Sequence, residues 1–250
     1  MPDVRDSFRN VAPNYAKSTF HASSIRLQEV LDLARPRPGD LALDVATGTG
    51  NTAFALAPYV RRVVGLDLTR EMLLEGRRVA AERNIVNVDW VIGDATRLPF
   101  QDQTFDVYTV RAAPHHFADV DLFLAEAFRV LKRHRDAAFI DCAPPLPARD
   151  VLHEVEVRRD PSHVLSLTVE EWVRKLERAG FEVEHAVLRE LDWNYEEWMA
   201  NMAVAPALAA ELATLIESAE GEARRQLHPE RREGTLWHAY WHALIRAHRP

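Results

Sequence analysis

The stretch Leu41-Ala-Leu-Asp-Val-Ala-Thr-Gly-Thr-Gly50 decides the fold, because a short apolar strand runs there into a glycine-rich turn, and a helix opens at Asn51. Gly48 and Gly50 can adopt positive φ and let backbone N–H groups approach a ligand closely. The helix directs the positive end of its dipole to the same place. The pattern predicts a nucleotide-binding turn at the carboxyl end of the strand.

Two classes of ligand fit such a turn. A dinucleotide is one, because residues 48–53 match G-x-G-x-x-G/A and Asp67 lies about 20 residues beyond the turn, where a ribose-binding acid belongs. S-adenosylmethionine is the other. Asp44, an acid at the end of the strand, favours the second class, since a dinucleotide fingerprint normally carries only apolar residues there. The ammonium group of the ligand would pair with this carboxylate.

The composition limits the possible functions. With 250 residues, 47% of them hydrophobic, the chain can bury one sizeable core, and we expect a single domain over 1–250. The net charge of −7 leaves no broad cationic surface and argues against a nucleic-acid partner. No apolar stretch is long enough to span a bilayer, so we expect a cytoplasmic protein without a membrane segment.

Cysteine and histidine usage gives no sign of a metal site. Cys142 is the only cysteine, which excludes an internal disulfide and makes a Cys-rich metal site implausible. His238 and His242 have the i, i+4 spacing of a metal-binding pair, but no carboxylate accompanies them. No bound metal is expected.

Strands and helices alternate along the first 142 residues. Apolar strands are expected in the 41–50 stretch and at 62–67, 88–92, 105–111 and 137–142. Such alternation implies a parallel sheet with helices on both faces, and ligands of these sheets bind beyond the carboxyl ends of the strands. Asp44, Asp67, Asp94 and Arg111 all fall at those ends.

The second half of the chain departs from this alternation. A capping box at 168–171 predicts a helix that ends at Gly180, and a sixth strand follows at 181–188. Two helices are expected at 196–204 and 206–226. The last segment, 236–246, fits the periodicity of a strand and that of a helix equally well. Periodicity leaves its conformation open.

Several ordered motifs together resemble the class I S-adenosylmethionine-dependent methyltransferases, within the small-molecule group that includes the ubiquinone/menaquinone biosynthesis C-methyltransferases. The motifs are Leu43-Asp-Val-Ala-Thr-Gly-Thr-Gly50, Gly65-Leu-Asp-Leu-Thr-Arg-Glu-Met-Leu73, Gly93-Asp-Ala-Thr-Arg-Leu-Pro-Phe-Gln-Asp-Gln-Thr-Phe-Asp106, His115-His-Phe, and Ala243-Leu-Ile-Arg-Ala-His-Arg-Pro250. The resemblance covers nearly the whole chain. It implies a Rossmann-like, doubly wound, mostly parallel seven-stranded sheet whose last strand is antiparallel. We also expect an N-terminal arm and covering helix at 1–36 and a helical cap at 194–227, inserted before the last strand.

The resemblance also implies a site for S-adenosylmethionine. In such a site the turn at Gly48 and Gly50 wraps the methionine part, and Asp67 binds the ribose hydroxyls. Leu68 and Met72 flank the adenine, Asp94 and Ala95 read its edge, and Tyr15 closes over the cofactor. The residues expected to bind the cofactor are Tyr15, Asp44, Ala46, Thr47, Gly48, Gly50, Asp67, Leu68, Met72, Gly93, Asp94, Ala95 and Arg111.

Two positions depart from the family pattern. Ala46 stands where many relatives have their first glycine, and Lys132-Arg-His-Arg135 replaces the usual Pro-Gly-Gly turn before the fifth strand. We expect non-glycine residues with positive φ in the second of these turns.

The acceptor side of the site is less specified. His115 and His116 follow the fourth strand, where the family's substrate pocket opens, and either lines the pocket or acts as a general base; lining is the favoured hypothesis. Asp160 and His163 either overhang the same pocket or simply form an Asp-Pro turn, and both alternatives stay open.

Taken together, the sequence predicts an S-adenosylmethionine-dependent methyltransferase that acts on a small organic acceptor, aromatic or apolar in character, with a homodimer left open. Transfer from a sulfonium is an in-line displacement, so the enzyme mainly has to align the reacting atoms in a dry pocket. One alternative is an NAD-dependent oxidoreductase, against which Asp44 and the sequence Gly93-Asp94-Ala95 argue. The other is a methyltransferase-like protein that binds without catalysing, which nothing in the sequence excludes.

Overall fold

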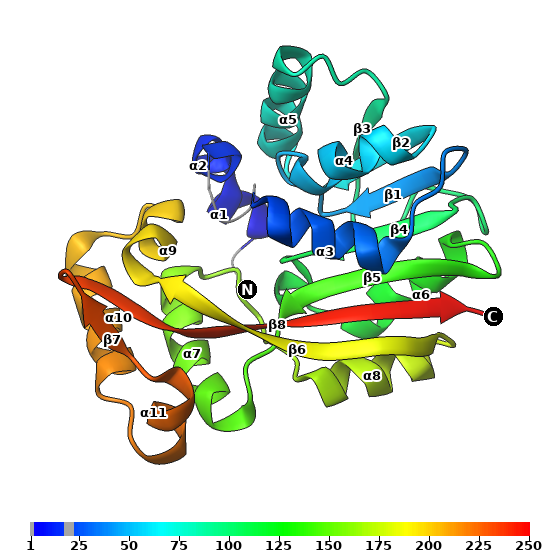
Figure 1. Ribbon diagram of the computed structural model, residues 1–250. Coiled ribbons are helices and arrows are strands. Elements are labelled where there is room, and N and C mark those ends of the chain that lie inside the picture. Colours follow the sequence, from blue (N-terminus) through cyan, green and yellow to red (C-terminus); the bar gives the residue numbers. More distant parts are fainter. Residues whose placement is uncertain (1–2, 18–22) are drawn as a thin grey trace.

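A single sheet forms the centre of the computed structural model, which describes residues 3–17 and 23–250 (Figure 1). The strand order is β3-β2-β1-β4-β5-β8-β6. The parallel strands are β1 (Leu41–Val45), β2 (Arg62–Asp67), β3 (Val88–Ile92), β4 (Val107–Arg111) and β5 (Arg135–Cys142). Residues 1–2 and 18–22 of the predicted N-terminal arm lie outside the described residues.

The last segment of the chain is a strand. β8 (Thr235–Arg249) runs antiparallel between β5 and β6 (Glu182–Asn194), and the short β7 (Glu230–Arg232) pairs with its beginning. Pairing with a strand on each side satisfies the backbone N–H and C=O groups of β8. Periodicity alone could not predict this pairing. The predicted doubly wound sheet with an antiparallel last strand is confirmed.

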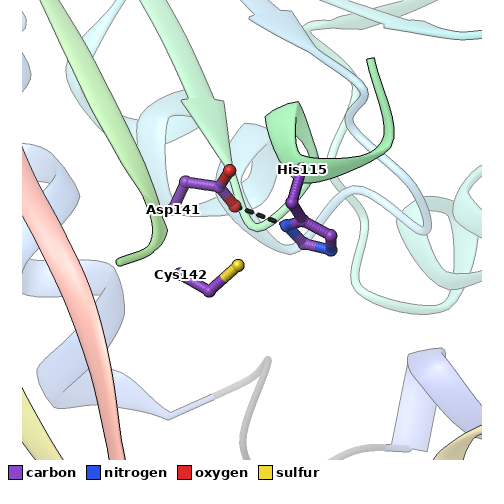
Figure 2. Close-up of side chains that lie close together, drawn as sticks. All are labelled: His115, Asp141 and Cys142. Atoms are coloured by element: carbon purple, nitrogen blue, oxygen red, sulfur yellow. Dashed lines mark hydrogen bonds and ion pairs between the residues drawn. The ribbon is translucent and has the colours of Figure 1, made fainter. Parts of the chain in front are cut away.

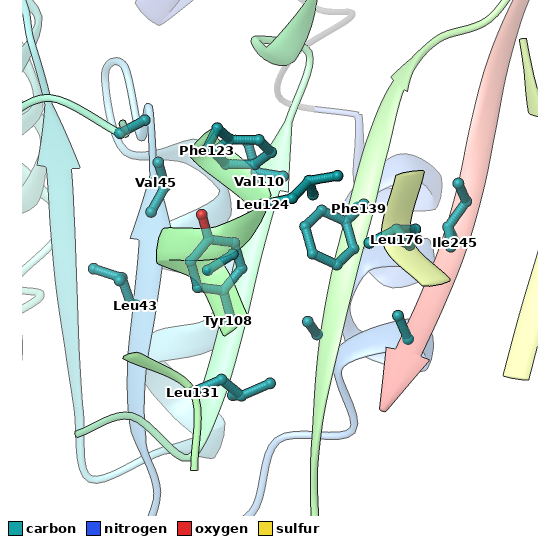
Figure 3. Packing of buried hydrophobic residues seen from close by; sticks show 14 of the residues in the cluster. Leu43, Val45, Tyr108, Val110, Phe123, Leu124, Leu131, Phe139, Leu176 and Ile245 are labelled. Atoms are coloured by element: carbon teal, nitrogen blue, oxygen red, sulfur yellow. The ribbon is translucent and has the colours of Figure 1, made fainter. Parts of the chain in front are cut away.

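Two hydrophobic layers cover the two faces of the sheet. Alternate residues of β1 point to opposite faces: Ala42 packs toward α3 (Ser24–Ala34) and α4 (Asn51–Leu56), whereas Leu43 packs toward α6 (Val120–Val130) and α8 (Val169–Arg178). Figure 3 shows the second layer, in which Tyr108 and Phe139 of the sheet meet Phe123 of α6. On the first face, the 3-10 turn η1 (Ala57–Tyr59) continues α4, and α5 (Arg70–Glu82) contacts β2 and β3.

Local signals in the sequence set several helix ends. Asp119 caps α6 by accepting from the N–H of Leu122, and Thr168 with Glu171 forms the predicted capping box of α8.

His134, in the turn that replaces Pro-Gly-Gly, has φ of 59°, as expected for this turn, and Ala46 has φ of 51°. Both non-glycine residues occupy the left-handed region.

Helices gather beyond the end of the sheet where β6 and β8 project. α9 (Tyr195–Asn201), α10 (Pro206–Glu217) and α11 (Gly221–Leu227) lie between these strands in the sequence, and α10 and α11 pack on α7 (Leu146–Arg159) (Figure 1). The single helix expected over 206–226 is wrong, because the chain breaks between α10 and Gly221, whose φ of 56° does not continue a helix.

Two short N-terminal helices lie over the carboxyl edge of the sheet. α1 (Val4–Arg9) and α2 (Ala12–Lys17) both contact α5, and α2 also contacts α9 (Figure 1). They therefore join the two halves of the structure above the strand ends. No helix in residues 3–17 or 23–250 is both long and apolar enough to cross a membrane.

Candidate active site

A cleft of about 330 Å³ opens at the carboxyl ends of β1, β2, β3 and β4, within the size range of small-molecule sites. Most residues predicted from sequence to bind the cofactor line it: Tyr15, Asp44, Ala46, Thr47, Gly48, Asp67, Leu68, Met72, Gly93, Asp94, Ala95 and Arg111. Gly50 does not line the cleft. A Cβ there would lie 2.5 Å from the Trp90 ring and 2.9 Å from that of Phe54, so Gly50 is required for packing.

One hydrogen bond within the glycine-rich turn after β1 and two to the end of β2 hold this turn in place. The N–H of Gly48 donates to Oδ2 of Asp67 over 2.8 Å, the N–H of Gly50 to the carbonyl of Thr47 over 2.9 Å, and the N–H of Thr47 to the carbonyl of Leu66 over 3.0 Å. A dinucleotide-binding turn presents such N–H groups to a pyrophosphate. These three donors are therefore not available to a ligand, whereas the first N–H groups of α4 remain available.

The carboxylate of Asp67 is fixed at the end of β2. Oδ2 accepts from Gly48, and Oδ1 accepts from the N–H of Thr69 over 2.8 Å. Thr69 is the N-cap residue of α5, and its side chain makes no capping hydrogen bond. Burial raises the pKa of Asp67, and the backbone donors oppose that rise. Each oxygen keeps a further lone pair for a ligand hydroxyl.

Asp44 is a buried acid at the inner end of the cleft. Oδ2 accepts from the hydroxyl of Thr47 over 2.6 Å, and Oδ1 accepts from that of Thr109 over 2.8 Å. Burial raises the pKa of Asp44 to about 6, against the effect of both hydroxyls and of Arg111. Arg111 in turn donates through Nε to the hydroxyl of Thr52 over 3.1 Å. An acid and a guanidinium therefore line the same cleft.

A smaller space of about 60 Å³, the inner chamber, adjoins the cleft and shares Phe8, Tyr15, Ala112 and His116 with it. All four residues predicted for the acceptor pocket line this chamber, namely His115, His116, Asp160 and His163. Sequence reasoning missed Glu156 and Tyr240, which also line it and which hydrogen-bond to each other through the Tyr240 hydroxyl. They are 84 residues apart, so no local pattern could have connected them.

His115 lies in the 3-10 turn η2 (Pro114–His116) and is held by Asp141 at the end of β5. Its Nδ1 is 2.6 Å from Oδ1 of Asp141, and Figure 2 shows the other ring nitrogen pointing away from both Asp141 and Cys142. Burial works against the charged imidazolium, yet the nearby Asp141 carboxylate holds the pKa of His115 well above its ordinary value. Burial also raises the pKa of the Cys142 thiol to about 11, so this thiol is neutral near pH 7.

Two further histidines face acids across the inner chamber. Nε2 of His116 is 3.9 Å from Oδ2 of Asp160, and its Nδ1 is 3.1 Å from the hydroxyl of Ser162. Nε2 of His163 is 3.0 Å from Oε2 of Glu156. Burial holds the pKa of His116 well below its ordinary value and also lowers that of His163. Both rings are therefore neutral near pH 7.

The N-terminal helices cover the boundary between the cleft and the inner chamber. The ring of Phe8 on α1 meets the ring of His116 edge-on, with centroids 5.2 Å apart. The hydroxyl of Tyr15 on α2 lies 3.4 Å from the sulfur of Met202, which follows α9. These contacts hold apolar side chains over the place where both spaces meet.

Known proteins share both the sequence and the architecture of this chain. A family model described as a methyltransferase domain matches residues 43–136. The uncharacterized methyltransferase YcgJ of Bacillus subtilis is 32% identical over 224 residues, which cover 87% of each chain. The ubiquinone/menaquinone biosynthesis C-methyltransferase UbiE of Dinoroseobacter shibae is 44% identical over 137 residues, which cover 52% of this chain and 54% of that protein.

Solved structures of methyltransferases share the fold of this chain. The crystal structure of YcgJ superposes with a TM-score of 0.83 at 28% identity, over 92% of this chain and 99% of that one. Geranyl diphosphate C-methyltransferase from Streptomyces coelicolor, solved with Mg²⁺, geranyl diphosphate and S-adenosyl-L-homocysteine, has a TM-score of 0.64 at 15% identity, over 91% of this chain and 79% of that one. This second likeness is one of fold.

Proposed function

This chain belongs to the class I methyltransferase family, and we propose that it uses S-adenosylmethionine to methylate a small organic acceptor. The buried acid Asp44 behind the turn after β1 carries the proposal, since a buried carboxylate suits an ammonium group and does not suit a negatively charged pyrophosphate. The same observations disfavour an NAD-dependent oxidoreductase.

The cleft residues fit this cofactor. Gly48 has φ of +54°, and a Cβ built there would meet no atom within 4 Å, so the space in front of the turn is open to a ligand. In the proposed site Asp44 pairs with the ammonium of the methionine part and Arg111 lies close to its carboxylate. Asp67 accepts hydrogen bonds from the ribose hydroxyls, and Met72 packs against the adenine.

S-adenosylmethionine would supply an electrophilic methyl group at the junction of the cleft and the inner chamber. The protein's contribution is to hold the acceptor in line with it and to keep water away. Phe8 and Tyr15 line both spaces and lie above this junction. Alignment of this kind is worth several kcal/mol of the barrier, on the order of 7 to 11 in the best intramolecular models.

The inner chamber indicates what kind of group is methylated. It is small, and histidines and acids form much of its wall, which also includes Trp193 of β6 and Trp198 of α9. The reacting end of the acceptor is therefore compact and able to form hydrogen bonds. We assign His116 a lining role, because Ser162 and Phe8 fix its ring.

A labelled-methyl assay tests the proposal. The protein is incubated with S-adenosylmethionine carrying a labelled methyl group and with phenols, thiols, amines and carboxylic acids in turn. We expect label in one small-molecule class, and less label with Asp67→Ala at a cofactor concentration that does not saturate this variant, because its cofactor affinity should be lower. If the protein binds S-adenosylhomocysteine but labels no class, the chain is a binding protein rather than an enzyme.

A further inference from the structure

We propose that His115, Asp141 and Cys142 form a binding site for one divalent ion of the Zn²⁺ type in the wall of the inner chamber. One ring nitrogen, one carboxylate oxygen and the sulfur all lie within 4.8 Å of one another (Figure 2). Imidazole, carboxylate and thiolate are the ligands that Zn²⁺ takes from proteins. Three protein ligands beside a cavity are also the usual arrangement of a zinc site with one open position.

Three buried acids lie around the chamber. Asp141, Glu156 and Asp160 are only 2%, 4% and 2% exposed. In the described part of the chain their ion-pair partners are histidines rather than lysines or arginines. Arg159 also lines the chamber: its Nε and Nη2 donate to the carbonyl of Trp198 over 3.2 and 3.1 Å, and, against the effect of burial, its charge helps to lower the pKa of Asp160. Buried carboxylates are costly unless paired; His115 pairs with Asp141 in the ligand-free protein, and a divalent ion bound there would take over that pairing.

A second group of similar donors lies near arginine side chains. Asp136, Glu184 and His248 meet the same distance criterion on β5, β6 and β8. There, however, Arg35 lies 3.9 and 3.8 Å from the two carboxylates, and Arg246 lies 2.9 Å from Glu184. Arginines already neutralise this group, so it serves as the control for the first.

Ion binding requires only small changes at His115. The 2.6 Å between Nδ1 and the Asp141 oxygen is a hydrogen-bond distance, whereas two ligands about 2 Å from a tetrahedral ion lie roughly 3.3 Å apart. A side-chain movement of under about 1 Å increases the distance between Nδ1 and the Asp141 oxygen to that value. The ion displaces the Nδ1 proton of the His115 ring and the proton of the Cys142 thiol, and both protons pass to solvent. Ser166, with Oγ 2.9 Å from Sγ, can then donate to the thiolate.

The open position of the ion points to a class of acceptor, and this step rests on the proposed function. His115 and Cys142 line the inner chamber, so the fourth ligand comes from that space. A bound hydroxyl or thiol loses its proton more readily on a divalent ion. We therefore infer an alcohol, phenol or thiol as the acceptor, with the ion rather than a histidine favouring its anionic form.

Metal titration of the whole chain, freed of any affinity tag, tests the site directly. After dialysis against a chelator, Zn²⁺ content per chain is measured by mass spectrometry, and Co²⁺ is titrated as a spectroscopic substitute. We expect one ion per chain, intense visible bands typical of four-coordinate Co²⁺, and a sulfur-to-cobalt charge-transfer band. Cys142→Ser should lose that band, and Asp141→Asn should weaken Zn²⁺ binding by at least about tenfold, the lower end of the effect of losing an outer-shell partner.

The controls separate a metal site from general damage. His248→Gln, in the second group, should leave the stoichiometry and the spectrum unchanged. Binding of S-adenosylhomocysteine by each variant shows that the variant is folded. If the wild-type protein does not bind S-adenosylhomocysteine, the result counts against the proposed function but does not affect the metal measurement. Less than one ion per chain in the wild type, or the same Co²⁺ spectrum in Cys142→Ser, would overturn the metal proposal.

Discussion

Cofactor affinity should depend on the ionisation of Asp44, and Asp44→Asn isolates this dependence. With a pKa of about 6, the carboxyl is about 10% ionised at pH 5 and about 90% ionised at pH 7. The ammonium of S-adenosylhomocysteine is charged across this range and pairs only with the ionised form. The association constant should therefore rise about tenfold, or about 1.4 kcal/mol, from pH 5 to pH 7.

Calorimetric titration at pH 5, 6 and 7 measures this dependence. Asp44→Asn should bind more weakly at pH 7 and show a nearly flat profile. The ligand-free protein should behave in the opposite way: because the folded-state pKa of this acid is raised, the stability it contributes is present at low pH and is lost as the pH rises through about 6. Equal slopes in the wild type and Asp44→Asn would refute an ammonium contact at Asp44.

Four further substitutions test the cleft and the turn beside it. Asp67→Ala should lower the affinity for S-adenosylhomocysteine by on the order of tenfold to a hundredfold, because a charge-assisted hydrogen bond contributes ~1.5 to 3 kcal/mol; calorimetry checks this, and unchanged affinity would remove Asp67 from the site. Gly48→Val should fold, as circular dichroism would show, and fail to bind S-adenosylhomocysteine, since a side chain there enters the open cleft at φ of +54°. Gly50→Ala should instead lower the melting temperature, because its Cβ meets Trp90. If Gly48→Val lowers the melting temperature and Gly50→Ala abolishes binding, the two glycines have the opposite roles. Ala46→Gly should stabilise the protein by up to about 1 kcal/mol in urea unfolding, because the left-handed conformation costs a non-glycine residue ~1 to 2 kcal/mol and the added freedom of the unfolded chain offsets part of that; a loss of stability would mean that the methyl group makes a contact worth more than the strain.

Strand ends could be located from the sequence because each ends an apolar run. That logic placed Asp44, Asp67, Asp94 and Arg111 along one edge, and all four line the cleft. The same rule applies to Asp141, which lies next to the last residue of β5.

Only some of the residues that line the inner chamber could be predicted from the sequence. The loop after the fourth strand identified His115 and His116, but their partners come from β5 and from the turn that follows α7. Which residues meet there depends on how α7 and β8 pack, and Glu156 and Tyr240 carry no local sign of it. Packing against Trp90 likewise made Gly50 a structural glycine rather than a ligand contact.

The central claim is that the cleft binds S-adenosylmethionine rather than a dinucleotide, and a thermal-shift comparison tests it most directly. At about 100 times its Kd, S-adenosylhomocysteine should add about 2.7 kcal/mol to the free energy of unfolding, and NAD at the same concentration should add nothing measurable. A clear rise in melting temperature with NAD and none with S-adenosylhomocysteine would contradict the account.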